Sequence, residues 1–388
     1  MKGTRHPLRA VEETDSQTGA RCTRYEQEQG EAQVFYYSSP GLSEDGRYLP
    51  CWSSASGDWQ LHAIDRRENV SIQLTEGATS FDPDGPAFDS KRQRIYYRNG
   101  QYIRFVDINT FEDDWLFEIP EGFHGLHLSS NNDYLVFSYF ETFSVGRTPS
   151  GAAIKSAAVL QYRPRSIIVA INLNDGLAEN VWGDYNFLTH TIIAPWDSTL
   201  VLFADQSWAN RQQEIFVVNR EFTEAKKPTQ LFTGYGLNYV GHSWMTNDGF
   251  IAAQYAEYLN VDRRNRFSDE VHFNAITRED GTGMRRARFP GGHKPTHCHA
   301  QRSDGLWVGD GWIKPNGEHD NGWLSLMKNR WQTQEMDIFP LFQTKHIWRR
   351  PFHPHPWILP DESQVVFAAN FNGAQNQIAV VTIPDHLR

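Results

Sequence analysis

A polar turn followed by two short β-rich runs recurs along the whole chain, and this repeat limits the possible folds more than any other feature. One copy reads "SEDGRYLPCW" and then "WQLHAIDRRENVSIQLTEG". Each run is rich in branched and aromatic residues and ends in a charged or Asn-containing turn, which is typical of strands in an antiparallel sheet. Seven copies are found, with equivalent turn residues at Asp45, Asp89, Asn132, Asp197, Asp248, Asp304 and Asp361. No long amphipathic helix separates them, so the sequence predicts an all-β fold.

The spacing of these turns predicts a seven-bladed β-propeller formed by residues 1–388 as a single domain. Successive turns lie about 43 to 65 residues apart, which suits a blade of four strands with loop insertions. The longest insertion, from Glu141 to Arg165, should be a loop on one face. The last copy lacks a fourth strand, and residues 20–27 can supply it, so that N- and C-terminal strands close the ring in one blade. A pair of β-sandwiches is the alternative, although it would not need seven matching copies.

Charge and hydropathy limit the partners of the chain. The formal net charge of −10 is spread along 388 residues and forms no basic stripe, which argues against nucleic acid as a partner. We find no apolar signal-peptide core and no segment able to cross a bilayer, so we expect a cytoplasmic protein without a membrane partner. The cysteines Cys22, Cys51 and Cys298 are odd in number and scattered, which predicts no disulfide framework. The sequence does not indicate the oligomeric state.

Histidines lie shortly before the turns of the last three copies. His242 occurs in "VGHSWMTNDG", His297 in "KPTHCHAQRSDG", and His353 and His355 in "FHPHPWILPDES". If the copies are equivalent, all four residues lie on innermost strands or the loops entering them, and they point to one end of the central channel. Because residues two apart share a face of a strand, His353 can pair with His355, and His297 with His299.

Such a set of imidazoles would suit a borderline divalent metal such as Mn, Fe, Ni or Zn. The alternative is that each histidine only hydrogen-bonds the backbone of a crowded channel. Cys298 should point to the opposite face from its neighbours and belong to the core.

These motifs resemble those of the oligogalacturonate lyases, polysaccharide lyases built on a seven-bladed propeller with a metal at the channel mouth. The most specific matches are "HPHPWILPDESQVVFAAN", the run from His297 to Gly311 that contains "VGDG", and the histidine six residues before Asp248. Weaker similarity covers most of the chain, including "QLTEG" at residues 73–77. The resemblance implies pectin degradation, a part of carbohydrate metabolism, in which β-elimination cleaves uronate oligosaccharides and leaves a 4,5-unsaturated uronate.

The resemblance also implies a metal site. Its ligands would be His297, His353 and His355, with Mn²⁺ as the expected ion and His299 as the nearest alternative to His297. The family has a glutamine ligand three residues before the first histidine of His-Pro-His-Pro, and this chain has Arg350 there. An arginine cannot coordinate a cation, so we expect Arg350 to bind the substrate carboxylate.

Two catalytic residues are implied by the same resemblance. His242 falls at the position of the proposed base, and Arg211 is the closest candidate for a functional arginine of the family. His190 in "LTHTII" and Tyr239 are candidates to contact the substrate and protonate its leaving group, although either could equally be a packing residue.

Other functions stay open. The substitution at Arg350 leaves room for a different uronate, such as a glucuronate-containing oligosaccharide. A metal-dependent hydrolase or epimerase could use the same histidines. A non-catalytic propeller that binds a protein partner should lack convergent histidines altogether.

Overall fold

A computed structural model describes residues 1–77, 81–82, 85–119, 122–141, 164–205, 214–221, 228–233, 238–261, 267–290, 295, 297–313, 319–344, 353–371 and 375–388. Within these ranges the chain is almost entirely β-strand, with one short 3-10 helix at Asp385–Leu387. The all-β prediction is therefore confirmed. No helix in this part of the chain is long and apolar enough to span a membrane.

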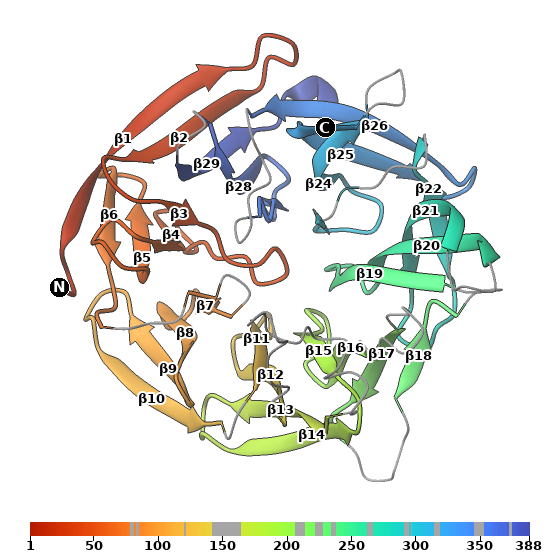
Figure 1. Cartoon of the computed structure of the whole chain (residues 1–388), viewed down its shortest axis with the longest axis horizontal. Helices are drawn as coiled ribbons and strands as arrows, with labels where there is room; N and C mark the ends of the chain where they lie inside the picture. The colour runs from red at the N-terminus through yellow and green to blue at the C-terminus, as the bar shows by residue number, and fades with distance from the viewer. Residues whose placement is uncertain are drawn as a thin grey trace, which may run out of the picture. The chain divides into compact units, whose positions relative to one another are not determined.

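The strands form groups of four that follow one another along the chain (Figure 1). Five groups are separate four-stranded sheets, and two more lie within a nine-stranded sheet of order β27-β28-β29-β2-β1-β6-β5-β4-β3. A pair of β-sandwiches would have four sheets. The six sheets in the described part of the chain therefore do not fit that alternative.

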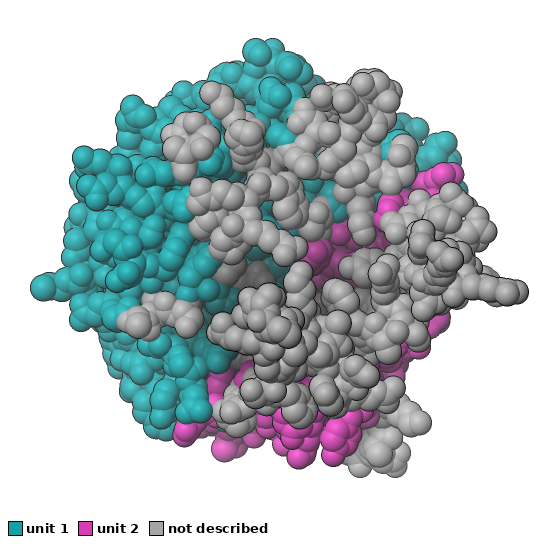
Figure 2. Space-filling model, in the orientation of Figure 1, with its two compact units in different colours: residues 1–117, 289–388 teal, residues 118–288 magenta. Residues whose placement is uncertain are grey.

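The first of two compact units comprises residues 1–117 and 289–388 (Figure 2). Its strands are β1 (Arg5–Thr14), β2 (Arg21–Gln27), β3 (Ala32–Gln33), β4 (Tyr48–Ser53), β5 (Gln60–Asp65), β6 (Val70–Gln73), β7 (Ala87–Asp89), β8 (Arg94–Asn99), β9 (Tyr102–Asp107), β10 (Asp113–Glu118), β23 (Cys298–Ala300), β24 (Trp307–Ile313), β25 (His319–Arg330), β26 (Glu335–Gln343), β27 (Trp357–Ile358), β28 (Gln364–Asn370) and β29 (Asn376–Thr382).

The second unit comprises residues 118–288. Its strands are β11 (Phe123–Leu128), β12 (Tyr134–Phe140), β13 (Ser166–Asn172), β14 (Ala178–Asp184), β15 (Leu188–Ile193), β16 (Leu200–Asp205), β17 (Glu214–Asn219), β18 (Thr229–Leu231), β19 (Asn238–Met245), β20 (Ile251–Val261), β21 (Phe267–Thr277) and β22 (Arg285–Arg288). The predicted insertion after Glu141 falls mainly on residues 142–163, which lie outside the described ranges.

The repeated turns have a common local cause. A carboxylate oxygen of Asp45, Asp89, Asp197 and Asp361 accepts the backbone N–H two residues later, at 3.1, 3.0, 2.9 and 3.0 Å respectively. This bond between an aspartate and its own backbone stabilises a tight turn. In these four groups the aspartate therefore shapes the turn between the first and second strands.

The N-terminal segment completes the last group, as predicted for residues 20–27. Strand β2 pairs with β29 from Arg21 opposite Thr382 to Tyr25 opposite Ile378. The two ends of the chain therefore lie in one sheet.

Strand β1 was not predicted, and it links the first and last groups. It pairs with β6 through Arg5 to Pro7 and with β2 from Leu8 onward. Pro7 lies where β1 changes partner, a position that tolerates the missing N–H of proline.

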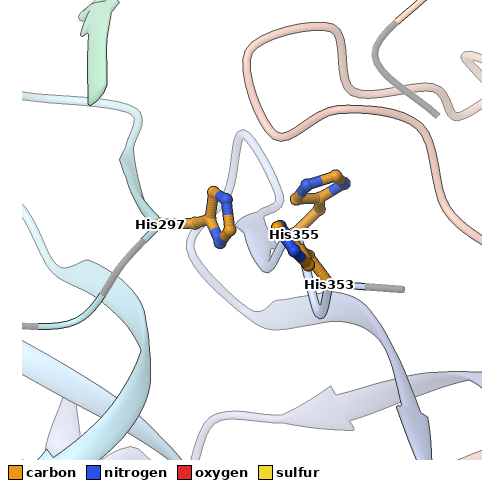
Figure 3. Close-up of side chains that lie close together, drawn as sticks. All are labelled: His297, His353 and His355. Atoms are coloured by element: carbon orange, nitrogen blue, oxygen red, sulfur yellow. The ribbon is translucent and has the colours of Figure 1, made fainter. Parts of the chain in front are cut away.

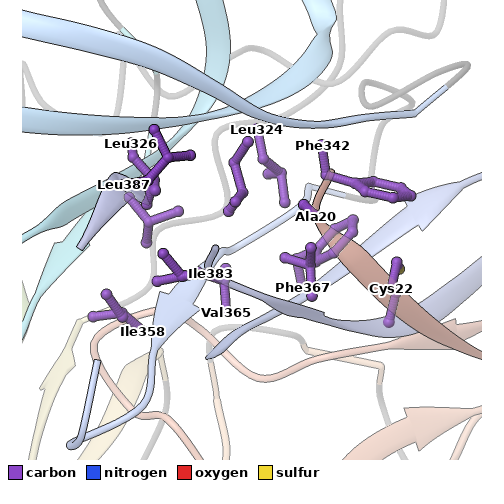
Figure 4. Close-up of a cluster of buried hydrophobic side chains, with 14 of the residues drawn as sticks. Ala20, Cys22, Leu324, Leu326, Phe342, Ile358, Val365, Phe367, Ile383 and Leu387 are labelled. Carbon is purple, nitrogen blue, oxygen red and sulfur yellow. The ribbon is translucent and has the colours of Figure 1, made fainter. Parts of the chain in front are cut away.

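Neighbouring groups share buried cores. Leu324 and Leu326 of β25 belong to one cluster with Phe367 of β28 and with Ala20 and Cys22 of the N-terminal segment (Figure 4). A fully buried leucine or phenylalanine contributes roughly 1.5–3 kcal/mol. The cluster therefore holds the last group against the group of β23 to β26, both in the first unit.

Candidate active site

Three histidines converge within the first unit. His297 directly precedes β23, and His353 and His355 lie in the segment before β27 (Figure 3). Each offers one ligand nitrogen, and these three nitrogens lie within 4.8 Å of one another. The ring centroids are 5.0 Å apart for His297 and His353, 4.7 Å for His297 and His355, and 5.6 Å for His353 and His355.

A buried aspartate orients the first of these imidazoles. Asp310 of β24 bonds His297 twice, through the ring Nδ1 at 2.7 Å and through the backbone N–H at 2.9 Å. Burial lowers the pKa of His297 to about 3, which makes the ring neutral. When Nδ1–H donates to the carboxylate, Nε2 has its lone pair available for a ligand. Sequence reasoning missed Asp310, although it is the acidic residue of "VGDG".

The two C-terminal histidines are held by an irregular backbone. His355 has a φ of 41°, in the left-handed region, and residues 353–356 precede the strand. His353 and His355 do aim as a pair, as expected, but from irregular backbone rather than from one face of a strand. The Gln33 amide donates to the His353 carbonyl at 2.6 Å, and the Asn376 amide donates to Gln33 Oε1 at 2.8 Å. These bonds hold the segment in place without a regular ladder.

Two adjacent tyrosines pack against the cluster. The ring of Tyr36 meets His355 edge-on with centroids 4.9 Å apart, and Tyr37 lies 5.8 Å from His297. Both tyrosines are buried and come from the segment between β3 and β4. They restrict the imidazole rings and keep water from that side. The sequence signal was the aromatic run "FYY" at residues 35–37, which sequence reasoning did not use.

His299 has a different role from His297. Its Nδ1 accepts the N–H of Ile358 in β27 at 3.2 Å, and it is not one of the three clustered histidines. In the second unit, Nδ1 of His127 accepts the N–H of Ile193 at 3.3 Å in the same way. Such histidines link the first strands of neighbouring groups, which is the backbone-bonding alternative considered above. Cys298 is buried, as expected.

The second unit brings His190 and His242 together. Their ring centroids are 6.0 Å apart, with an interplanar angle of 70°. The side chain of Tyr239 falls outside the described part of the chain, although its backbone lies in β19. Arg211 and Arg350 also fall outside the described residues.

Histidines of the last four groups lie at the same distance along the chain from the turn after the first strand. The N–H groups of Ala194, Thr246 and Leu359 each bond across the turn that follows the first strand of the group. Four residues before them stand His190, His242 and His355, respectively.

The same register extends to His297. Ala300 pairs with Trp307 in β24, which makes Gln301 the equivalent of Leu359. His297 stands four residues before Gln301. The position four residues before this turn residue therefore carries histidine in four successive groups.

Comparison with known proteins decides the family. Residues 1–387 match the family model described as oligogalacturonate lyase. The chain belongs to the oligogalacturonate lyase family. This confirms the resemblance found in the sequence and makes the enzyme class that of a carbon–oxygen lyase.

Relatives within the oligogalacturonate lyase family match almost end to end. An oligogalacturonide lyase of Pectobacterium atrosepticum is 24% identical, over 99% of this chain and 98% of its own length. An oligogalacturonate lyase of Dickeya dadantii is 22% identical, over 96% and 95%. A solved oligogalacturonate lyase in complex with manganese has a TM-score of 0.81 and 18% identity, and covers 100% of this chain and 99% of its own.

The clustered residues fit a divalent metal. Three imidazole nitrogens within 4.8 Å provide a nitrogen donor set for a borderline cation. Asp310 supplies the carboxylate that metal-binding histidines commonly bond through their second nitrogen.

Proposed function

We propose that this chain cleaves oligogalacturonides by β-elimination and leaves a 4,5-unsaturated uronate at the new chain end. The convergence of His297, His353 and His355 carries this proposal, because it provides a metal site within a chain that matches the lyase family over residues 1–387. The two curated relatives are named as an oligogalacturonide lyase and an oligogalacturonate lyase, which supports the same substrate class here.

We propose that the seven strand groups close into a seven-bladed propeller formed by residues 1–388 as one domain. Three observations support closure. The groups follow one another in chain order, β2 completes the last group, and shared cores join neighbouring groups within each unit. In a closed ring, the register position of His190, His242, His297 and His355 would face one channel mouth.

The reaction needs charge neutralisation before proton removal. The C5 proton of a uronate is acidic only when the adjacent carboxylate is neutralised, because the carbanion-like transition state adds negative charge to it. A divalent ion, for which we propose Mn²⁺, would supply this neutralisation when bound by His297, His353 and His355. Arg350 and Arg211 are proposed to grip the substrate carboxylates, since guanidinium groups bind them bidentately.

His242 is the proposed base. A neutral imidazole is suited to accept the C5 proton. The electrons of the C5–H bond then form the C4=C5 double bond, and the bond to O4 breaks with its electron pair on oxygen. The leaving oxygen takes a proton from water or from a nearby acid, for which Tyr239 is the proposed candidate; the sequence also suggested His190, whose role is taken up below.

A panel of uronate oligosaccharides tests the function. Purified protein with Mn²⁺ should raise the ultraviolet absorbance of the unsaturated product with galacturonate oligomers, and a chelator should remove the activity. A signal only with glucuronate-containing oligomers would assign a different substrate. New reducing ends without that absorbance would indicate a hydrolase, and neither signal with any oligomer would contradict a lyase.

A further inference from the structure

Two neighbouring strands of the second unit carry a β-bulge at the positions of their histidines. In β15, His190 and Thr191 lie opposite the single residue Phe203 of β16. In β19, Gly241 and His242 lie opposite Gln254 of β20. A bulge interrupts the ladder and turns a side chain away from the direction that regular alternation would give it. The two imidazoles are therefore aimed by irregular backbone on both strands.

His190 also occupies a strained backbone conformation. Its φ is 51°, in the left-handed region, where a residue with a Cβ pays a conformational cost. His355, the register equivalent of His190 among the clustered histidines, has a φ of 41°. Strain of this kind persists where the surrounding structure fixes it, and it concentrates at functional sites. Both equivalent positions keep the strained conformation and the imidazole.

The side chain of His190 is fixed next to His242. Thr189 Oγ1 lies 2.9 Å from His190 Nδ1, so a hydrogen bond sets the ring orientation. Thr189 is fully buried, whereas His190 and His242 are both partly exposed. The edge-to-face contact of the rings, with centroids 6.0 Å apart, then limits the rotation of His242. Thr189, His190 and His242 thus form a series that runs from a buried hydroxyl to the proposed base.

We propose that His190 is a positioning residue that holds the His242 ring in the orientation needed to accept the C5 proton. This inference rests on the proposed role of His242 as the base. It assigns His190 a role through His242, where the sequence suggested substrate contact. A misplaced base loses rate because proton transfer depends on a short and aligned approach.

A double-mutant cycle on the full chain tests this role. His190→Asn removes the ring, and asparagine is among the residues that tolerate a left-handed φ. We expect kcat to fall by about 10- to 100-fold, the size of loss that misplacement of a reacting group causes. KM for oligogalacturonide should stay within about twofold, because uniform substrate binding is not the interaction that is lost. In a His242→Ala background the same change should cost nothing further.

A matched pair of threonine variants provides the control. Thr189→Val cuts the bond to His190 and should lower kcat in the same direction but less. Thr277→Val removes a hydroxyl and its hydrogen bond from another fully buried threonine of the second unit, away from both bulges, and should leave kcat unchanged. The proposal would be overturned if the losses in kcat from His190→Asn and His242→Ala multiplied in the double variant. It would also be overturned if His190→Asn left kcat unchanged or altered KM alone.

Nuclear magnetic resonance of the His242 ring tests the positioning role of His190 without depending on lyase activity. The imidazole nitrogen resonances of His242, assigned with the His242→Ala variant, should shift or broaden in His190→Asn and in Thr189→Val. Unchanged resonances in both variants would refute the positioning role. If wild type shows no lyase activity, the proposed function fails, and the resonances still decide whether His190 orients His242. Should His190→Asn not fold, Thr189→Val carries both measurements.

Discussion

At the scale of the residue, histidines on the first strands of the groups have two different roles. His127 and His299 accept backbone N–H groups of the neighbouring strand, whereas His297 bonds Asp310 through Nδ1 and clusters with His353 and His355. The group that bonds Nδ1 distinguishes the two roles. A backbone N–H donates to the Nδ1 lone pair, whereas a carboxylate accepts the Nδ1 proton and leaves the Nε2 lone pair available for a ligand. A count of histidines in the sequence does not make this distinction.

Asp310 provides a prediction at this scale. Asp310→Asn replaces the carboxylate that accepts the Nδ1 proton of His297, so the ring loses its fixed orientation and basicity. We expect metal affinity to fall by about 10- to 100-fold, the usual cost of losing such a partner. Calorimetric titration of metal-free protein with Mn²⁺ measures it. Asp304→Asn, at an exposed turn, is the control and should leave affinity unchanged. Equal affinities for wild type and Asp310→Asn would show that this bond does not serve metal binding.

At the scale of the element, the sequence was sufficient for the strands and turns but not for the bulges. Turn aspartates and β-rich runs act locally, so their pattern predicted the groups of four and the pairing of residues 20–27 with the last group. His355 has a left-handed φ in a segment that is bonded to residues distant in the chain, through Gln33 to the His353 carbonyl and through Asn376 to Gln33. Regular alternation therefore predicted that His353 and His355 aim together but not the irregular backbone that holds them. The strand β1 was missed because it is mostly exposed and lies outside the repeat.

A buried histidine in β5 makes stability depend on pH. Burial lowers the pKa of His62 to about 3, and its Nδ1 bonds Ser71 Oγ at 2.9 Å. Below the ordinary pKa of 6.5, the unfolded chain binds a proton here that the folded chain does not, so stability falls as pH falls from 6.5 towards 3. Each such histidine contributes about 1.4 kcal/mol per pH unit to this slope.

Urea unfolding between pH 7 and pH 4 measures the effect. The variant His62→Gln should be less stable at pH 7 but should show a shallower loss of stability with acid than wild type. The same dependence on pH in both proteins would mean that His62 is protonated in the folded state.

At the scale of the whole molecule, the ends of the chain are held together by direct pairing. Cys22 lies opposite Val381 in the register of β2 and β29, and both side chains are buried. Residues directly opposite in an antiparallel pair have Cβ atoms about 4.5–5.5 Å apart, close to the separation that a disulfide needs. The native thiol of Cys22 therefore offers a way to lock the two ends.

Val381→Cys should form a disulfide with Cys22 under oxidising conditions. Because this bond closes a loop of nearly the whole chain, it should stabilise the protein by about 4 kcal/mol, near the upper end for disulfides. Mass spectrometry and the unfolding midpoint with and without reductant test this. Val380→Cys is the matched control, since Val380 pairs with Thr23 and its side chain faces the other side of the sheet. A disulfide in the control, or none in Val381→Cys, would contradict the register.

The most direct test of the proposed lyase follows product absorbance while Mn²⁺ is titrated into metal-free protein. Wild type should gain activity on oligogalacturonides and saturate at about one ion per chain, with the three-histidine site as the binding site. A variant with both His353→Ala and His355→Ala should bind no ion in this range and show no Mn²⁺-dependent turnover. If the double variant binds Mn²⁺ stoichiometrically and turns over as wild type does, His297, His353 and His355 do not form the catalytic metal site.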